Sequence, residues 1–224
     1  MLNLWLRRND TRVPFRNETI AKTVVHHTEK NMSLIHKSWL ELKPNENEDG
    51  NQEWFDEYYK RIKLKKEYKN IPKEVFEQWI HAHHKNYETL NNYAWIDYEK
   101  IEFKLLKWSF EKLENINIIE NYREYSDSRA MCNDLSQFCC CDEDLKHWKE
   151  NGTWRIPPII LDVNSIIDDI PKWSEIKEPF QLVEGHSRIG YLKSMNRISK
   201  LGKEKISDNH KIYLMTKVRM HNNV

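Results

Sequence analysis

The stretch from Pro179 to Met195, "PFQLVEGHSRIGYLKSM", constrains the fold more than any other part of this sequence. Its mostly apolar run has the composition of a strand and stops at Gly185, and apolar residues then recur at helical spacing from Ile189. Two similar runs, "IPPIILDV" before it and "HKIYLMTKV" after it, predict further strands. Strand, polar turn, helix and strand in this order indicate an α/β unit.

The first 150 residues have a mainly helical pattern instead. Helices are predicted within residues 31–42, 53–68, 72–84, 93–116 and 143–151. The Asn, Asp, Gly and Pro content of residues 43–53 predicts a loop, and Gly152 is placed to end the last helix. The predicted buried stripe of the third helix is Val75, Phe76, Trp79, Ile80 and His83. We therefore expect an α+β protein, with a mainly helical region (1–150) packed on a small α/β core (151–224).

Composition restricts the partners and the compartment. Thirty-six lysines and arginines against 35 acidic residues leave no overall positive charge that would favour DNA or RNA. No apolar run approaches the length of a membrane span, and the first residues, "MLNLWLRRNDTRVPF", have the reverse order of a secretory signal. Three of the four cysteines are consecutive and cannot all bridge one another, which favours reduced thiols. We expect a cytoplasmic protein with no membrane partner.

The turn after the predicted strand at 180–184 carries the densest group of reactive side chains. Gly185 allows a sharp bend, and the N–H groups that follow it at the helix start favour an anion. His186 can move a proton, Ser187 can cap the helix or contact a phosphate, and Arg188 can bind a phosphate with two N–H groups. Glu184 suits a general base or a magnesium ligand. A turn with only a structural role would also use glycine and serine here, so a functional site and a structural turn both remain possible interpretations.

The sequence "LVEGHSRIGYL" resembles the signature of the ParB/sulfiredoxin superfamily, in which a strand ends in a short glycine-containing turn that opens a helix. The most similar variant is the "DGHTR" pattern of the free-serine kinases in that superfamily. "IPPIIL" resembles the family's Pro-Ile strand before the motif, and "HKIYLM" resembles the strand after it. The resemblance covers residues 155–224, and it implies a small ParB/sulfiredoxin-like α/β core.

The resemblance also implies a function. Gly185, His186, Ser187 and Arg188 would contact the phosphates of a nucleotide, ATP or CTP, and Glu184 would hold Mg²⁺ or position a water. Glu184, His186 and Arg188 would be the catalytic residues of a phosphotransferase or nucleotide hydrolase. The alternatives are a non-catalytic protein that uses this fold to bind a nucleic-acid or protein partner, and a nuclease. No second acidic catalytic residue can be placed from the motif; Asp97, Glu99 and Glu102, or an acid within 162–169, could supply one.

Two other groups carry possible metal ligands. Cys132, Cys139, Cys140, Cys141 and His147 are enough ligands for zinc but lack the usual spacing, so burial in the core is the favoured interpretation. His81, His83 and His84 share one predicted helix, where packed or exposed histidines are more common than metal ligands. The lysine-rich segment 60–69 could contact nucleic-acid phosphates, but its neighbouring acids favour an exposed helix face.

Overall fold

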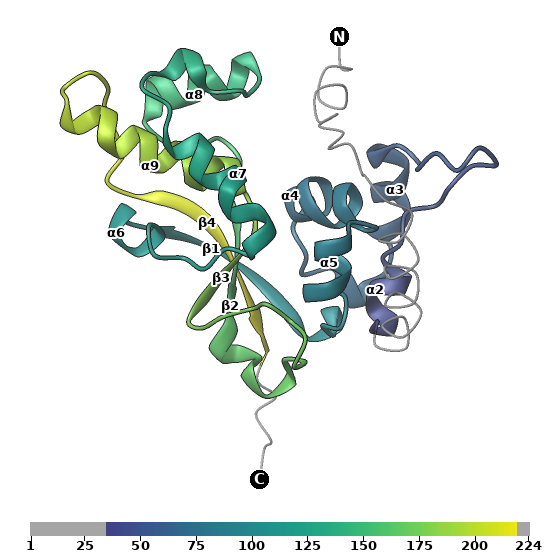
Figure 1. Cartoon of the computed structure of the whole chain (residues 1–224). Coiled ribbons are helices and arrows are strands. Elements are labelled where there is room, and N and C mark those ends of the chain that lie inside the picture. Colours follow the sequence, from purple (N-terminus) through teal and green to yellow (C-terminus); the bar gives the residue numbers. More distant parts are fainter. Residues whose placement is uncertain (1–34, 219–224) are drawn as a thin grey trace, which may run out of the picture.

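The computed structural model describes residues 35–218, and within them helices cover both faces of one four-stranded sheet. One group of helices lies on the right of the sheet in Figure 1 and consists of α2 to α5. The other group lies at the upper left and consists of α7, α8 and α9. The arrangement is an α+β fold, as predicted. The α-helices are α2 (Lys37–Glu41), α3 (Phe55–Ile62), α4 (Lys73–Val75), α5 (Tyr87–Asn92), α6 (Phe110–Leu113), α7 (Glu120–Ala130), α8 (Asp142–Asn151) and α9 (His186–Lys200). α4 continues directly into a π-helical segment, Phe76–His81.

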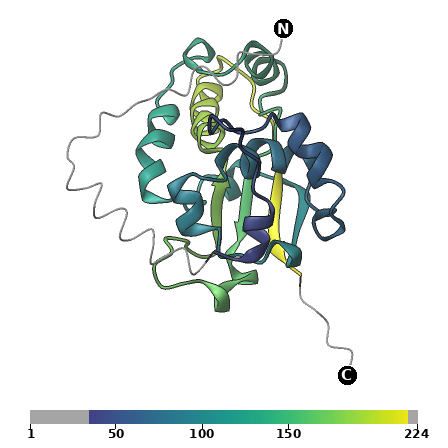
Figure 2. The ribbon, with the colours of Figure 1, turned by 90° about the vertical axis from the view of Figure 1, so that its right-hand side faces the viewer.

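The sheet has the strand order β1-β4-β2-β3. Its strands are β1 (Ile101–Trp108), β2 (Ile159–Asp162), β3 (Phe180–Glu184) and β4 (His210–Lys217). β4 pairs antiparallel to β1 and parallel to β2, and β2 pairs antiparallel to β3. Figure 2 shows the four strands side by side, with β3 at one edge and β1 at the other. The predicted strands β2, β3 and β4 and the predicted helix α9 are confirmed, so the turn at Gly185 joins an edge strand to the longest helix described.

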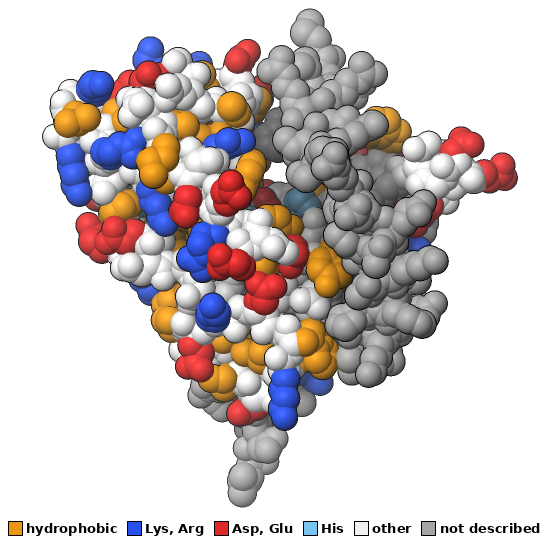
Figure 3. Space-filling view, in the orientation of Figure 1, with side chains coloured by type: hydrophobic (Ala, Val, Ile, Leu, Met, Phe, Trp, Pro, Cys, Tyr) orange, Lys and Arg blue, Asp and Glu red, His pale blue; other side chains and the backbone are white. Residues whose placement is uncertain are grey.

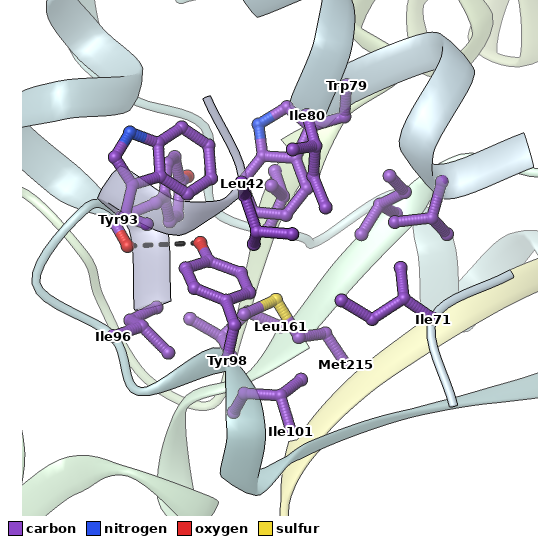
Figure 4. Packing of buried hydrophobic residues seen from close by; sticks show 14 of the residues in the cluster. Leu42, Ile71, Trp79, Ile80, Tyr93, Ile96, Tyr98, Ile101, Leu161 and Met215 are labelled. Atoms are coloured by element: carbon purple, nitrogen blue, oxygen red, sulfur yellow. Dashed lines mark hydrogen bonds between the residues drawn. The ribbon is translucent and has the colours of Figure 1, made fainter. Parts of the chain in front are cut away.

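Alternating residues of each strand face two separate cores. Leu161 and Met215 face a core that includes several aromatic side chains from the first helices, among them Trp39 and Trp79. Figure 4 shows this core, in which the Tyr98 hydroxyl donates a hydrogen bond of 3.0 Å to the backbone oxygen of Tyr93. The neighbouring strand residues Ile160, Leu182, Ile212 and Leu214 belong to or pack on the second core, under α6, α8 and α9. A sheet buried on both faces needs strands that are apolar at successive positions, which β2 and β3 provide.

The helix predicted within residues 93–116 is wrong across its middle, because residues 101–108 form β1. Ile101 and Phe103 pack on the first core, and Leu106 and Trp108 pack on the second. When a strand is covered on both faces, its apolar residues need not alternate, and their spacing can match that of a helix. The sheet therefore takes one strand from the region expected to be helical. Asp97 accepts a hydrogen bond from the Glu99 N–H and caps only the short turn Tyr98–Lys100, which directly precedes β1.

The predicted burial of His83 is also wrong, because His84 is the buried histidine. The helix that begins at Lys73 changes to π-helical geometry over Phe76–His81. The wider turn shifts the side chains that follow by about one position relative to an α-helix. His84 then stacks on Trp39, with ring centroids 4.6 Å apart, while His83 remains partly exposed. This shift leaves His83 facing the turn at Gly185, as described below.

The remaining helix predictions agree with the structure within residues 35–218, while residues 31–34 of the first predicted helix lie outside the described part of the chain. α8 ends at Gly152, which has a φ of 62°, and Pro72 precedes the helix that begins at Lys73. Residues 43–53 form a loop. None of the helices within residues 35–218 has the length and apolar character needed to cross a membrane.

Candidate functional site

The backbone at the end of β3 bends at Gly185, where φ is 109°. A Cβ at this position would lie 2.5 Å from the Cβ of Pro158 and 3.1 Å from the guanidinium of Arg188. Only glycine therefore combines the left-handed conformation with the available space. The predicted sharp corner between strand and helix is present, and α9 begins at the next residue, His186.

The N-terminus of α9 presents backbone N–H groups that the described part of the chain does not use. The first helical hydrogen bond runs from the Ile189 N–H to the Gly185 oxygen, and no side chain caps the helix. For the N–H groups of His186, Ser187 and Arg188, no acceptor lies among residues 35–218. The Ser187 hydroxyl is instead 2.8 Å from the Tyr125 hydroxyl on α7. Three N–H groups at the positive end of a helix dipole can bind an anion such as a phosphate.

The Arg188 side chain is directed into the protein. Its guanidinium donates to the backbone oxygen of Ile156 at 3.1 Å and to the Gln78 side chain at 2.7 Å, and it lies 3.4 Å from the Glu184 carboxylate. Only 18% of the side chain is exposed, and burial lowers the pKa of this guanidinium while Glu184 opposes that effect. The predicted phosphate contact would require Arg188 to exchange some of these partners. In the present arrangement, Arg188 ties the turn to the helix that carries Gln78.

Glu184 is held between two nitrogen-bearing side chains. One carboxylate oxygen faces Arg188, and the other lies 3.6 Å from Nε2 of His83. His83 is partly exposed and comes from the helix that follows Pro72. Glu184 and His83 therefore form a pair between two segments that are far apart in the sequence. A carboxylate paired with an imidazole can orient the ring and accept or relay a proton.

His186 is buried directly behind the turn. It is 7% exposed, its ring lies 4.4 Å from the ring of Tyr122, and its buried Nε2 atom has no hydrogen-bond partner in the described part of the chain. Burial lowers the pKa of His186 to about 4, while the nearby Glu184 opposes this shift. The ring is therefore neutral at pH 7 and offers one unused nitrogen as donor or acceptor.

Comparisons with protein-family models, with curated proteins and with solved structures find no match to this chain. The side chains around the turn at Gly185 therefore carry the functional argument.

The acidic residues expected to complete the site lie elsewhere. Asp97 pairs with Lys100 at 2.8 Å, Glu99 pairs with Lys37, and Glu102 pairs with Lys104. Within the other expected segment, 162–169, Asp169 pairs with Lys217 on β4. Among the described residues, Glu184 is the one carboxylate that makes an ion pair with a side chain of the turn at Gly185.

The possible metal ligands do not gather. Within residues 35–218, no three His, Cys, Asp or Glu side chains are arranged to hold a metal ion. The predicted burial of the cysteines holds for Cys132 but is wrong for Cys139, which is exposed, while Cys140 and Cys141 are partly buried. Burial raises the pKa of Cys140 to about 12. His81 and His84 bind the backbone oxygens of Glu53 and Trp39. Both oxygens of Glu184 already have partners, so the described residues do not fit a resident magnesium ion.

The remaining surface shows mixed charge. Figure 3 shows basic and acidic side chains interspersed on the face it displays. In the lysine-rich segment, Arg61 is paired with Glu53, Lys65 donates to the Glu41 backbone, and the other lysines are exposed. An open hollow of about 580 Å³ lies beside this segment and includes none of the residues of the turn. Its lining residues are Leu40, Glu41, Lys43, Pro44, Asn45, Glu46 and Arg61.

Sequence reasoning missed the side chains that other elements bring to the turn. These are Gln78, His83, Tyr122 and Tyr125. The group of three histidines at 81–84 was the only signal for any of them, and the spacing alone pointed to the wrong face. Gln78 and the two tyrosines carry no local motif.

Proposed function

We propose that this protein binds a nucleotide, ATP or CTP, through its phosphate groups at the N-terminus of α9. The observation that carries the proposal is the row of three N–H groups, from His186 to Arg188, without acceptors among the described residues. The unpartnered Nε2 of the buried His186 lies on the same turn and supports a polar ligand there. The resemblance of "EGHSR" to the ParB/sulfiredoxin turn supports the same ligand.

The supporting geometry is rigid before any ligand arrives. Gly185 has no room for a side chain, and Arg188 fixes the turn through Ile156 and Gln78. Donors that are already oriented bind a phosphate without a further ordering cost. Magnesium, where it takes part, would come with the phosphates, because both oxygens of Glu184 are engaged.

Phosphoryl transfer or nucleotide hydrolysis is the chemistry that we propose for the bound nucleotide. The helix N-terminus would stabilise the negative charge that develops on the transferred group. The Glu184–His83 pair is suited to accept the proton of the attacking hydroxyl or water, since His83 is partly exposed and hydrogen-bonding distance can be reached by a small movement. His186 is a poor general base, because burial lowers its pKa to about 4.

A second candidate is nucleotide binding without turnover, in a regulatory or interaction protein with a nucleic-acid or protein partner. The internal hydrogen bonds of Arg188 favour it, because they occupy the positive side chain that would otherwise stabilise a transition state. A nuclease is a third candidate, and the mixed charge of the face shown in Figure 3 gives it no support.

Binding is tested by calorimetry with ATP and CTP, with and without magnesium, on the wild type and on two variants of one position. Ser187→Asp places a negative charge beside the three N–H groups, where it stabilises the helix but repels phosphate. We expect it to weaken nucleotide binding by about tenfold or more. Ser187→Asn is the matched control, since it is similar in size and uncharged, and it should bind as the wild type does. Equal affinity of the two variants, or no binding by the wild type, would refute the proposal.

Turnover is tested separately by incubating the protein with each nucleotide and magnesium and analysing the products. Product formation that is lost in Glu184→Gln, with binding retained, supports catalysis by the Glu184–His83 pair. Binding without product supports the regulatory candidate. Nicking of a plasmid that stops on addition of EDTA would support the nuclease.

A further inference from the structure

β1 forms an open edge of the sheet. Among residues 35–218, its only strand partner is β4, and Figure 2 shows it as the last strand on that side. Leu105 is 53% exposed and the Lys104 side chain is also 53% exposed, so the middle of the strand is accessible. Open strand edges carry unpaired N–H and C=O groups that can pair with another strand.

The hydrogen-bond pattern identifies the residues whose backbone groups point outward. Val218 donates to the oxygen of Lys100, which lies directly opposite it in the register of β1 and β4. Because such pairs alternate along an antiparallel ladder, the even-numbered residues of β1 bond to β4. The N–H of Tyr213, opposite Leu105, agrees with this, since it points away from β1 to Pro158. The outward residues are therefore Ile101, Phe103, Leu105 and Lys107. Of these, Ile101 already donates its N–H to the Tyr98 oxygen, so Phe103, Leu105 and Lys107 carry the free N–H groups of the edge within the described residues.

We propose that two copies of this chain pair antiparallel through the edge of β1, with the two-fold axis at Phe103. In this register Ile101 lies opposite Leu105 of the second copy, and the two Phe103 residues lie opposite each other. The Phe103 and Leu105 side chains then lie on one face of the joined sheet, while Ile101 stays buried in the first core of its own chain. On the other face, Glu102 of each copy lies opposite Lys104 of its partner. The edge is thus complementary to itself in both charge and polarity.

The alternative registers are less favourable. An outward residue must pair with another outward residue, so the register can change only in steps of two. One step places the two Lys104 residues opposite each other, which is repulsive. The step beyond it places Lys104 opposite Leu106 and Glu102 opposite Trp108, which leaves both charges without an opposite partner. One step in the other direction places the two Glu102 residues opposite each other, and the next leaves Ile101 as the only β1 residue opposite another β1 residue. Among the registers that pair several residues of β1, the one centred on Phe103 therefore matches opposite charges.

Charge reversal tests this register with the full chain. Lys104→Glu leaves two acidic residues at positions 102 and 104, and Glu102→Lys leaves two basic ones. Each variant alone then places like charges opposite each other, whereas a mixed pair restores two opposite-charge contacts. We expect each single variant to dimerise about tenfold or more weakly than the wild type, and an equimolar mixture to associate as the wild type does.

Sedimentation velocity from micromolar to several hundred micromolar protein measures the association. The exposed contact between Glu102 and Lys104 within one chain contributes little to folding, so circular dichroism should show both variants folded. Recovery of the dimer only in the mixture supports the proposal, because no change in folding of either variant alone explains it. A wild type that stays monomeric, or a dimer that neither reversal weakens, would overturn it.

Discussion

Acidification from pH 8 to pH 5 should destabilise this fold through two buried histidines, His186 and His210. Burial lowers the pKa of each to about 4 in the folded protein, and an unfolded histidine titrates near 6.5. Below pH 6.5 these two histidines therefore bind protons in the unfolded chain but stay neutral in the folded chain. The stability from the neutral rings is complete above pH 6.5 and is lost as the pH falls toward 4.

The size of the effect follows from the interval between the two pKa values. A pH of 5 lies about 1.5 units below the pKa of an unfolded histidine. At 1.36 kcal/mol per unit, each histidine therefore lowers the free energy of unfolding by about 2 kcal/mol. The two histidines together lower the free energy of unfolding by about 4 kcal/mol between pH 8 and pH 5. This is a large part of the stability of an ordinary domain.

Urea unfolding followed by tryptophan fluorescence at both pH values measures this loss. His210→Asn keeps a polar group near the Thr153 hydroxyl, which lies 2.9 Å from Nδ1 of His210, but removes the titration. The pH-dependent loss should then fall by about 2 kcal/mol, whatever the variant's stability at pH 8. Other titrating groups contribute equally to the wild type and the variant, so they cancel in the comparison. A variant that keeps the full loss would refute the reasoning.

Two further substitutions test how the turn and its helix are held. Gly190→Ala would place a Cβ 2.4 Å from the Ser126 oxygen on α7, so we expect a loss of about 1–3 kcal/mol in urea unfolding. Gly202→Ala is its control, since no atom lies within 4 Å of a Cβ added there. Only the left-handed backbone conformation then costs about 1 kcal/mol. A smaller loss at Gly190 than at Gly202 would contradict the close packing at Gly190. Arg188→Met leaves the Ile156 oxygen without its donor and should cost about 3 kcal/mol by the same measurement. A loss below 1 kcal/mol would show that Arg188 does not hold the turn.

The local features of the C-terminal region could be predicted because each depends on neighbouring residues. A few consecutive residues determine each of these features: the apolar runs of β2, β3 and β4, the helical spacing of α9 and the bend at Gly185. β1 could not be recognised this way. Its residues face two cores at once, so their apolar positions no longer alternate, and a helix explains the same spacing.

The side chains around the turn at Gly185 come together through contacts between residues that are far apart in the sequence. Gln78 reaches Arg188 across 110 residues of sequence, and His83 reaches Glu184 from the same helix. Which histidine faces the turn depends on the π-helical geometry over Phe76–His81, and nothing in the histidine spacing indicates it. The second acidic residue expected by analogy is not supplied by Asp97, which is paired with Lys100.

The contacts of the turn give the helical region a physical role that the resemblance does not include. Arg188 and Glu184 belong to the region that resembles the ParB/sulfiredoxin core, but their partners Gln78 and His83 belong to the helix after Pro72. Removing that helix would leave a buried guanidinium and a carboxylate without these partners, at a cost of several kcal/mol. The turn can therefore keep its N–H groups in place only while the two regions stay packed together. Any ligand that binds at this turn would, by linkage, also stabilise the packing of the first helices on the sheet.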